Sequence, residues 1–441
     1  MIKRSSAALL ALVLFALLTG CSHLGYYAQA IGGHLAVMRA TIPISEVLGD
    51  ASGDPELKEK LAEVQAIRDF ASGALGLPDN DSYRTWADLG RPYVVWNVFA
   101  APEFSLQARD WCLVIVGCVS YRGYYDRQDA ERLAAELRQQ GYDTFVGGVP
   151  AYSTLGYFAD PVLSTFLRLG TLEVARTLFH ELAHQLVFVA GDSLFNESFA
   201  TAVENEGLRR WLARHGTPAQ RATFATQRAR KTAFAALMRD YRQQFQALYE
   251  TWRTLGSQRA AKADLFAALR RDYAALQAGW GGYAGYDAFF AGDLNNARLV
   301  SLALYAELVP AFEVLLARQN HDLARFYRSV ARLAALDDQA RRETLRELLA
   351  ASRDAERNPG DGTISIDDHF QGFWYQPRRA GSADAGGVAA QGYLPAASRF
   401  RSEVGINVAS PSITTLSPTV HTVSSTTRPF STITSLTVTL A

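Results

Sequence analysis

The sequence predicts an α+β fold whose C-terminal half is mostly helical. Between Tyr26 and about Pro150, helical periodicities alternate with short runs of strand-forming residues. From Thr171 to about Leu349 the periodicity is almost entirely helical. The chain has 441 residues, of which 49% are hydrophobic and 11% aromatic, so it can bury a large core. Its 44 Lys and Arg residues balance 44 Asp and Glu residues, and no nucleic acid partner is expected.

The first 20 residues predict a lipoprotein signal peptide. Lys3 and Arg4 precede a nearly unbroken apolar run, Ala7–Leu18, which is too short to cross a bilayer comfortably. The run closes with Leu-Thr-Gly-Cys, which resembles the bacterial lipobox and implies that Cys21 becomes the lipidated N-terminus. Ser22 stands where an aspartate would favour the inner membrane. We therefore expect a protein of the cell envelope, anchored by lipid to the outer membrane and facing the periplasm. The alternative is a plain apolar N-terminal helix.

Five elements are expected before the helical half. Pro55–Phe70 and Arg127–Gln140 have helical periodicity, whereas Tyr93–Phe99 and Cys112–Tyr121 are rich in strand-forming residues. The segment Tyr142–Pro161 reads as a strand, YDTFVGGV, followed by a loop.

Cys112 and Cys118 remain once Cys21 is assigned to lipid, and in an oxidising envelope they could pair. A straight strand would hold them about 20 Å apart. That is beyond disulfide reach, so pairing requires the chain to turn between them, which Gly117 permits. Two interpretations stay open: a disulfide, or two buried thiols in an apolar strand.

The stretch FHELAHQ contains two histidines four residues apart. It lies in an apolar segment, Thr171–Val189, that reads as one helix stopped by Gly191. On a helix this spacing places His180 and His184 on one face, with Glu181 about 100° around the axis. Neutral imidazoles suit Zn²⁺, which lowers the pKa of a bound water toward about 7, and a neighbouring carboxylate can take its proton. The pattern predicts two metal ligands, His180 and His184, with the general base Glu181 directly after the first.

A catalytic zinc normally takes three protein ligands and leaves one position for water. The segment FNESFATAVE, which begins at Phe195, offers Glu197 and Glu204. If Asp192 or Ser193 caps a second, antiparallel helix, Glu197 comes nearly level with the histidines. Glu204 lies on the same face, seven residues on, and is expected to orient a ligand or bind substrate. A solvated helix glutamate is the alternative for Glu204.

HELAH followed by NESFA resembles the gluzincin metallopeptidases, whose second helix carries the third ligand in an Asn-Glu-x-x-Ala motif. More narrowly, the chain resembles a family of bacterial lipoproteins described as predicted aminopeptidases. The segments that carry this likeness are LTGC, GYDTFVGGVPAYSTLGYFADP, HELAHQ, FNESFATAVENEG and LNNARL. The resemblance covers most of the chain from Cys21 to about Tyr375.

The resemblance implies a zincin-like fold, one Zn²⁺ per chain and a peptide substrate. Its ligands would be His180, His184 and Glu197, and its general base Glu181. The interval of 12 residues between His184 and Glu197 is shorter than in better-known gluzincins, which leaves the exopeptidase assignment open. We expect a zinc aminopeptidase. The alternatives are a zinc endopeptidase and a non-enzymatic envelope lipoprotein with a structural zinc site.

The loop after YDTFVGGV is a candidate for the substrate cleft. Zincins commonly bind the peptide backbone along an edge strand beside the metal helix, a form of strand addition. Tyr152, Tyr157 and Asp160 are the candidates to line it. The alternative for each is aromatic packing or an Asp-Pro turn.

A helical hairpin is expected further along the chain. Apolar residues recur at steps of three and four from Phe234 to Leu255 and resume at Leu265, with a break at Gly256-Ser257.

Asn295 directly precedes a helical segment and is expected either to cap it or to contact substrate. A phenol from Tyr286 or Tyr305 would be able to stabilise an oxyanion opposite the zinc, and the sequence does not choose between them.

The C-terminal tail has another composition. From Pro411 to Leu440, 16 of 30 residues are Ser or Thr, and Arg428 is the only charge. Such a segment has too little bulky apolar surface to offset the entropy of ordering it, so we expect disorder from about Ser382. A weak β-tail is the alternative. The predicted organisation is a signal peptide at 1–20, a zincin-like peptidase domain at 21–380 and a Ser/Thr-rich tail at 381–441.

Overall fold

The computed structural model describes residues 25–113, 117–251, 254–303, 308–357 and 437–439. The chain divides into two units, one of residues 1–357 with 431–441 and one of residues 358–430, and all described residues belong to the first. The predicted signal peptide, the lipidated Cys21 and the domain boundary predicted at residue 380 lie outside the described residues. No helix in the described ranges is both long and apolar enough to cross a bilayer.

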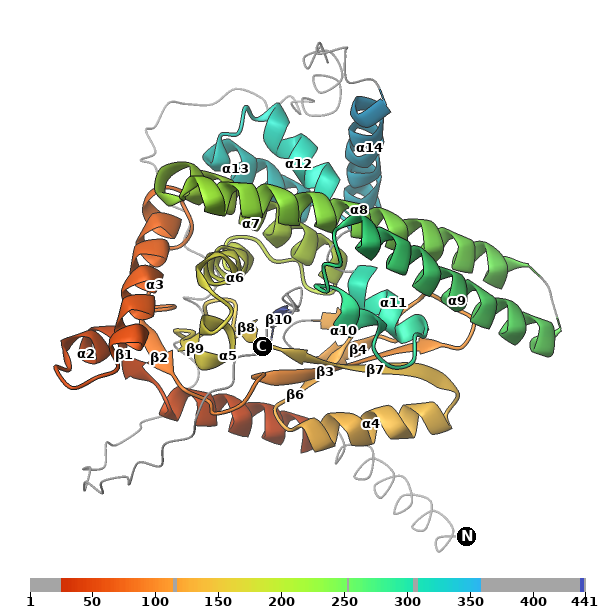
Figure 1. The fold of residues 1–441 in the computed structure, drawn as a ribbon, viewed down its shortest axis with the longest axis horizontal. Helices are drawn as coiled ribbons and strands as arrows, with labels where there is room; N and C mark the ends of the chain where they lie inside the picture. The colour runs from red at the N-terminus through yellow and green to blue at the C-terminus, as the bar shows by residue number, and fades with distance from the viewer. Residues whose placement is uncertain (1–24, 114–116, 252–253, 304–307, 358–436, 440–441) are drawn as a thin grey trace, which may run out of the picture. The chain divides into compact units, whose positions relative to one another are not determined.

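The described part is mixed α and β and mostly helical (Figure 1). Residues 25–39 form a first helix. The helices that follow are α2 (Ile44–Gly49), α3 (Pro55–Gly73), α4 (Arg127–Gln139), α5 (Ser164–Leu167), α6 (Thr171–His184), α7 (Ser193–His215), α8 (Pro218–Glu250), α9 (Leu255–Gly279), α10 (Asp287–Phe290), α11 (Asn296–Ala303), α12 (Val309–Arg318), α13 (Leu323–Ala334) and α14 (Asp338–Arg357). The strands are β1 (Ile42–Pro43), β2 (Thr85–Ala87), β3 (Val95–Pro102), β4 (Trp111–Leu113), β5 (Gly117–Val119), β6 (Arg122–Tyr124), β7 (Tyr142–Val149), β8 (Ala151–Ser153), β9 (Val162–Leu163) and β10 (Thr437–Thr439).

An antiparallel sheet in the order β6-β3-β7 lies beside the helices (Figure 1). β3 and β7 pair residue for residue over all eight positions. Side chains alternate between the two faces of β3, as the period of a strand requires. Val98 packs with Ala130 and Ala134 of α4, whereas Val95 and Phe99 join the main core. The sheet therefore ties α4 to the helical part of the molecule.

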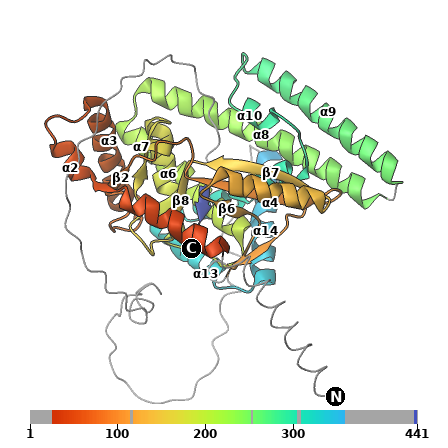
Figure 2. The same cartoon turned by 90° about the horizontal axis from the view of Figure 1, so that it is seen from below.

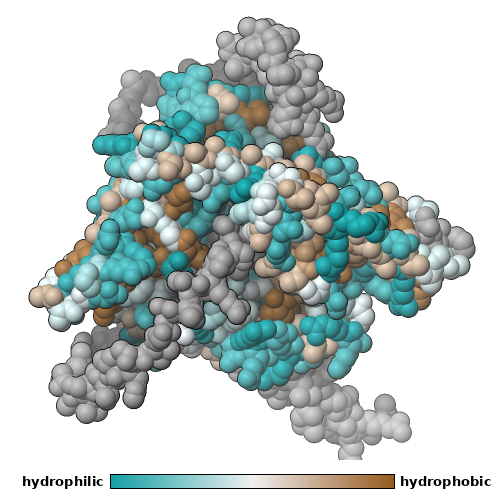
Figure 3. Space-filling model, viewed as in Figure 1, coloured by the Kyte–Doolittle hydropathy of each residue, from teal (hydrophilic) through white to brown (hydrophobic). Residues whose placement is uncertain are grey.

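α4 lies along this sheet in both orthogonal views (Figure 2). It begins at Arg127 because the Asp126 carboxylate accepts a hydrogen bond from Gln128 N at 2.6 Å and so caps the helix. Its outward face is hydrophilic (Figure 3), as expected of a helix with one apolar stripe.

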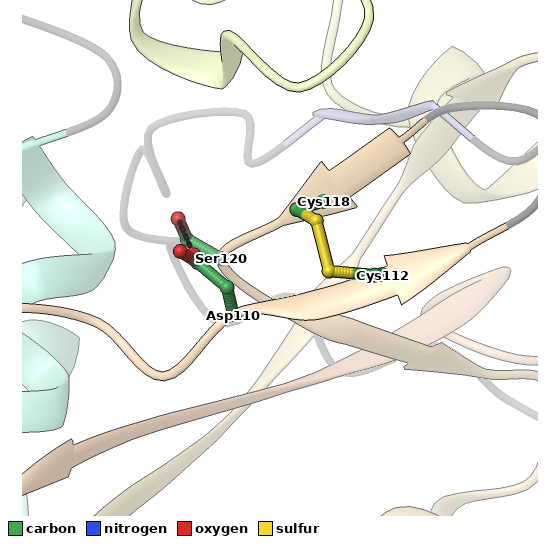
Figure 4. Close-up of a disulfide and its surroundings, with 4 residues drawn as sticks. All are labelled: Asp110, Cys112, Cys118 and Ser120. Carbon is green, nitrogen blue, oxygen red and sulfur yellow. Dashed lines mark hydrogen bonds between the residues drawn. A yellow bond between two sulfur atoms is a disulfide. The ribbon is translucent and has the colours of Figure 1, made fainter.

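The predicted strand Cys112–Tyr121 is wrong as one continuous element. The chain forms the hairpin β4–β5, and Gly117, at the start of β5, takes a left-handed φ of 76° that favours glycine. Cys112 and Cys118 then lie directly opposite each other and form a disulfide (Figure 4). The hairpin also contacts the connection between α6 and α7: a Cβ on Gly117 would lie 2.9 Å from the backbone nitrogen of Gly191.

α6 ends at His184, five residues before the predicted end at Val189. The side chain of Asn196 explains the difference. Its amide nitrogen donates to Val189 O and its amide oxygen accepts from Val189 N, both at 2.8 Å. The backbone of Val189 therefore has partners outside a helix, and the chain turns at Gly191, where φ is 82°.

α8 and α9 run side by side (Figures 1 and 2) and form the predicted helical hairpin. The break predicted at Gly256-Ser257 is wrong, because α9 already begins at Leu255. The hydroxyl of Thr254 accepts a hydrogen bond from Ser257 N and caps the helix, so the glycine lies within its first turn. The aromatic face of this hairpin packs into a core of its own, with Phe234, Phe245 and Phe266 among its buried residues.

The predicted loop after β7 contains the short strand β8, which packs against α6. β8 pairs in parallel with β10, a described part of the C-terminal tail, over three residues. The rest of the tail, for which disorder was predicted, lies outside the described residues.

Candidate active site

α6 and α7 carry the predicted ligands and pack against each other. α7 begins at Ser193 because Asp192 caps it: the carboxylate accepts a hydrogen bond from Phe195 N at 3.0 Å. Arg341 of α14 pairs with Asp192 at 2.9 Å and holds the cap in place. The predicted cap is confirmed, and it fixes how far along α7 Glu197 lies.

His180, His184 and Glu197 are brought together at the contact between the two helices. One donor atom from each lies within 4.8 Å of the others. His180 lies 3.2 Å from Glu197 and 3.0 Å from Glu204, whereas the later His184 lies 3.8 Å from the earlier Glu197, so the helices run antiparallel. All three residues are buried. Among the described residues, these three are the group of His, Cys, Asp or Glu side chains that could hold a metal ion.

The two histidines differ in their partners. Both ring nitrogens of His184 are buried and have no hydrogen-bond partner among the described residues. Burial, together with the nearby His180, holds the pKa of His184 well below its usual value, so its ring is neutral and able to donate a lone pair. An unpaired, neutral, buried imidazole is what a metal ligand requires before its cation binds.

Burial also disfavours a proton on His180, but hydrogen bonds from its ring to Glu197 and Glu204 outweigh that effect and raise its pKa to about 10. Nδ1 donates to Glu204 Oε2 at 3.0 Å, and Nε2 to Glu197 Oε2 at 3.2 Å. Because a ligand histidine must be neutral, a cation binding here would displace the proton between Nε2 and Glu197. The bond to Glu204 would remain and orient the ring.

Glu204 is fixed from the side opposite His180. Its Oε1 accepts from Arg176 at 2.5 Å and from Lys231 at 3.5 Å. Burial alone would raise the pKa of this carboxyl, but the Lys231 and Arg176 charges and the His180 ring hold it far below its usual value. Glu204 is therefore an ionised, buried acceptor that sets the orientation of the His180 ring, and it is not a solvated glutamate.

Glu181 is fully buried beside the ligand pair and lies outside the group of metal-binding atoms. Neither carboxylate oxygen has a hydrogen-bond partner in the described part of the chain. Burial raises its pKa well above the usual value. A buried carboxyl without partners is costly, so the arrangement indicates a group kept free for a reacting partner.

No sequence motif marks Tyr83, yet the structure places it near Glu181 and Asp160, whose charges act on its hydroxyl. The φ of Tyr83 is 64°, a left-handed value that is rare for a bulky residue. Its hydroxyl is buried without a hydrogen-bond partner in the described ranges. Strain of this kind gathers at functional sites. The segment NDSY carries no sequence signal that would have found this residue.

Tyr152 and Tyr157, predicted near the cleft, have different environments. Tyr152 is buried on β8, and its hydroxyl bonds His34 Nδ1 at 2.9 Å. Tyr157 is 52% exposed and is not one of the buried residues around Glu181.

Asn295 is a helix cap, because its side-chain oxygen accepts from Arg298 N at 3.1 Å. Its amide nitrogen donates to Thr144 O at 3.0 Å, so its polar groups are used in the scaffold. Tyr286 stacks on Phe234 with ring centroids 4.0 Å apart. Tyr305 lies outside the described residues.

The comparisons with known proteins agree with this arrangement at the level of a family. A family model described as "Putative aminopeptidase" matches residues 25–345. This range contains the three grouped residues His180, His184 and Glu197, together with Glu181 and Glu204. A search of curated proteins and a search of solved structures each find no match to the chain.

Proposed function

The chain belongs to the putative aminopeptidase family, and from that premise we propose that it is a zinc-dependent aminopeptidase of the bacterial cell envelope with a zincin-like fold. One observation carries the proposal: Glu181, buried and without a hydrogen-bond partner among the described residues, directly follows one of three residues that could hold a cation. A metal that only joined two helices would have no use for a carboxyl beside its three ligands. Hydrolysis needs a base there.

The donor set fits zinc. Zinc binds imidazole nitrogen and carboxylate oxygen at about 2.0–2.2 Å, so tetrahedral ligand atoms lie roughly 3.4 Å apart. Glu197 Oε2 lies 3.2 Å from His180 Nε2 and 3.8 Å from His184 Nε2. Two imidazoles and one carboxylate leave a fourth position for water, as in catalytic rather than structural zinc sites.

Zinc bound here would lower the pKa of a water molecule to about 7. The cation's charge would also favour the ionised form of Glu181. Glu181 would then accept a proton from the attacking water and return it to the leaving amine. Glu204 would keep the His180 ring in place, and the free hydroxyl of Tyr83 would donate to the carbonyl oxygen as negative charge develops on it.

The purified mature protein is expected to hydrolyse short peptides or aminoacyl amides in a metal-dependent way. Removal of the metal with a chelator should abolish the activity, and added Zn²⁺ should restore it, because the remaining groups cannot activate water alone. Release of free amino acids from a broad peptide library measures this. A zinc-loaded protein that cleaves no member of the library would favour a structural zinc site instead.

The proposed location rests on the predicted lipobox, and the disulfide Cys112–Cys118 supports an oxidising compartment. Replacement of Cys21 by Ser is expected to yield an unprocessed or soluble protein, because acyl chains supply most of the attachment. Membrane fractionation with mass analysis of the N-terminus tests this. A Cys21→Ser protein that stayed acylated and membrane-bound would contradict the anchor.

A further inference from the structure

Asp160 is a second buried carboxylate near Glu181, and no step of the hydrolysis uses it. It is 1% exposed. Its Oδ2 accepts from Thr154 N at 2.9 Å and from Ser153 Oγ at 3.4 Å. Its Oδ1 has no partner among the residues that the structure describes. Half of this carboxyl group is therefore anchored to the scaffold, and the other half is left for a ligand.

Hydrogen bonds tie Asp160 to the helix that carries the histidines. The carbonyl oxygen of Asp160 accepts from Tyr83 N at 2.6 Å. One residue earlier, Ser82 accepts from Gln185 Nε2 at 3.3 Å, and Gln185 directly follows the ligand His184. Glu181 lies four residues before Gln185 and therefore on the same face of this helix. Asp160 and the catalytic base are therefore held in one buried cluster.

The chemistry of the cluster calls for a cation. Asp160 Oδ1, the hydroxyl of Tyr83 and both oxygens of Glu181 are buried hydrogen-bonding atoms that lack partners within the described ranges. No Lys, Arg or His pairs with Asp160 among the ion pairs of the described residues, and burial raises its pKa to about 7. The charge of Arg68 also acts on the hydroxyl of Tyr83. The guanidinium group of Arg68, however, donates its hydrogen bonds to Ser72, Pro78, Asn80 and Ser82. A buried carboxylate in this condition gains most from a ligand that brings a positive charge and N–H donors.

We propose that Asp160 binds the α-ammonium group of a peptide substrate and thereby confines cleavage to the N-terminal residue. The inference rests on the proposed peptidase function and decides between its exopeptidase and endopeptidase forms. An α-ammonium group is cationic near neutral pH and donates three hydrogen bonds, whereas an internal peptide nitrogen is neutral and donates one. A second metal ion is a poorer occupant, because Asp160 is not among the residues grouped as metal ligands.

The test compares a tripeptide, Ala-Ala-Ala, with its N-acetylated form and with the analogue that carries a hydroxyl in place of the α-amino group. The wild-type enzyme is expected to favour the free tripeptide by about 10²-fold in kcat/KM over either neutral analogue, because each leaves Asp160 unpaired. Asp160→Asn should reduce this preference to within about tenfold, mainly through KM for the free tripeptide. Asp160→Glu, which keeps the charge, should retain more of the preference than Asp160→Asn. Asp69→Asn, at an exposed aspartate, is the matched control and should keep the wild-type preference.

Binding provides a second readout that does not depend on turnover. In the Glu181→Gln background, calorimetry should show tighter binding of the free tripeptide than of the acetylated one, and Asp160→Asn should remove the difference. If the wild type cleaves free and acetylated peptides equally, the assignment of Asp160 is wrong although the protein is a peptidase. A preference that survives in a folded, zinc-loaded Asp160→Asn enzyme overturns it as well. A wild type that cleaves nothing refutes the proposed function itself, while the binding difference still tests Asp160.

Discussion

Replacement of Glu181 by Gln is expected to reduce turnover by about 10²–10⁴-fold and to leave the metal content unchanged. Glu181 lies beside the three ligand atoms and is not one of them, so an amide in its place removes no metal bond. The amide cannot accept a proton from the attacking water. The substitution also removes an ionisable group that is fully buried without partners among the described residues, so the fold should not suffer.

Single-turnover rates and elemental analysis of the same preparation measure both quantities. Glu206→Gln is the matched control, because Glu206 lies on α7 and is paired with Arg209 and Arg210 away from the ligands. It should leave turnover within a small factor of wild type. If the Glu181→Gln enzyme kept full activity with its zinc, the base would have to be another group.

Replacement of His184 by Ala is expected to abolish both zinc binding and activity, because two remaining ligands hold zinc poorly. His184 gives the cleaner experiment of the two histidines. Its ring nitrogens make no hydrogen bond to other described residues, whereas loss of His180 would also remove the hydrogen bond to Glu204 Oε2. The measurement is zinc per chain by elemental analysis, with circular dichroism to confirm the fold.

Glu204→Gln is expected to fall between the wild type and His184→Ala, with zinc affinity about 10–100-fold weaker, because Glu204 orients a ligand without touching the metal. His321→Ala is the control. The side chain of His321 is 54% exposed, so the variant protein should bind zinc normally. A full complement of zinc in His184→Ala would show that the metal, if present, lies elsewhere.

The sequence predicts that His180, His184 and Glu197 come together, because the geometry that groups them is local. A spacing of four residues places His180 and His184 on one face of any helix. The Asp192 cap then sets the start of the second helix, and the rise per residue brings Glu197 level with the histidines. Each of these steps depends on residues close together in the chain.

The surroundings of the site depend on distant contacts. Tyr83 lies almost a hundred residues before Glu181, and only the packing of the whole fold brings them together. The same applies to the end of α6. Val189 continues the apolar pattern of a helix, but the side chain of Asn196, on the next helix, supplies the backbone of Val189 with other partners. Periodicity alone cannot report such competition.

The hairpin β4–β5 contains the disulfide Cys112–Cys118 and contacts the turn between α6 and α7. Gly117, next to Cys118, lies so close to Gly191 that a side chain on it could not be accommodated without moving the turn between α6 and α7. In a reducing cytoplasm the two cysteines would remain thiols, and the hairpin would brace that turn less firmly. On the proposed route to the cell envelope, formation of this disulfide would therefore make the turn between α6 and α7 firmer.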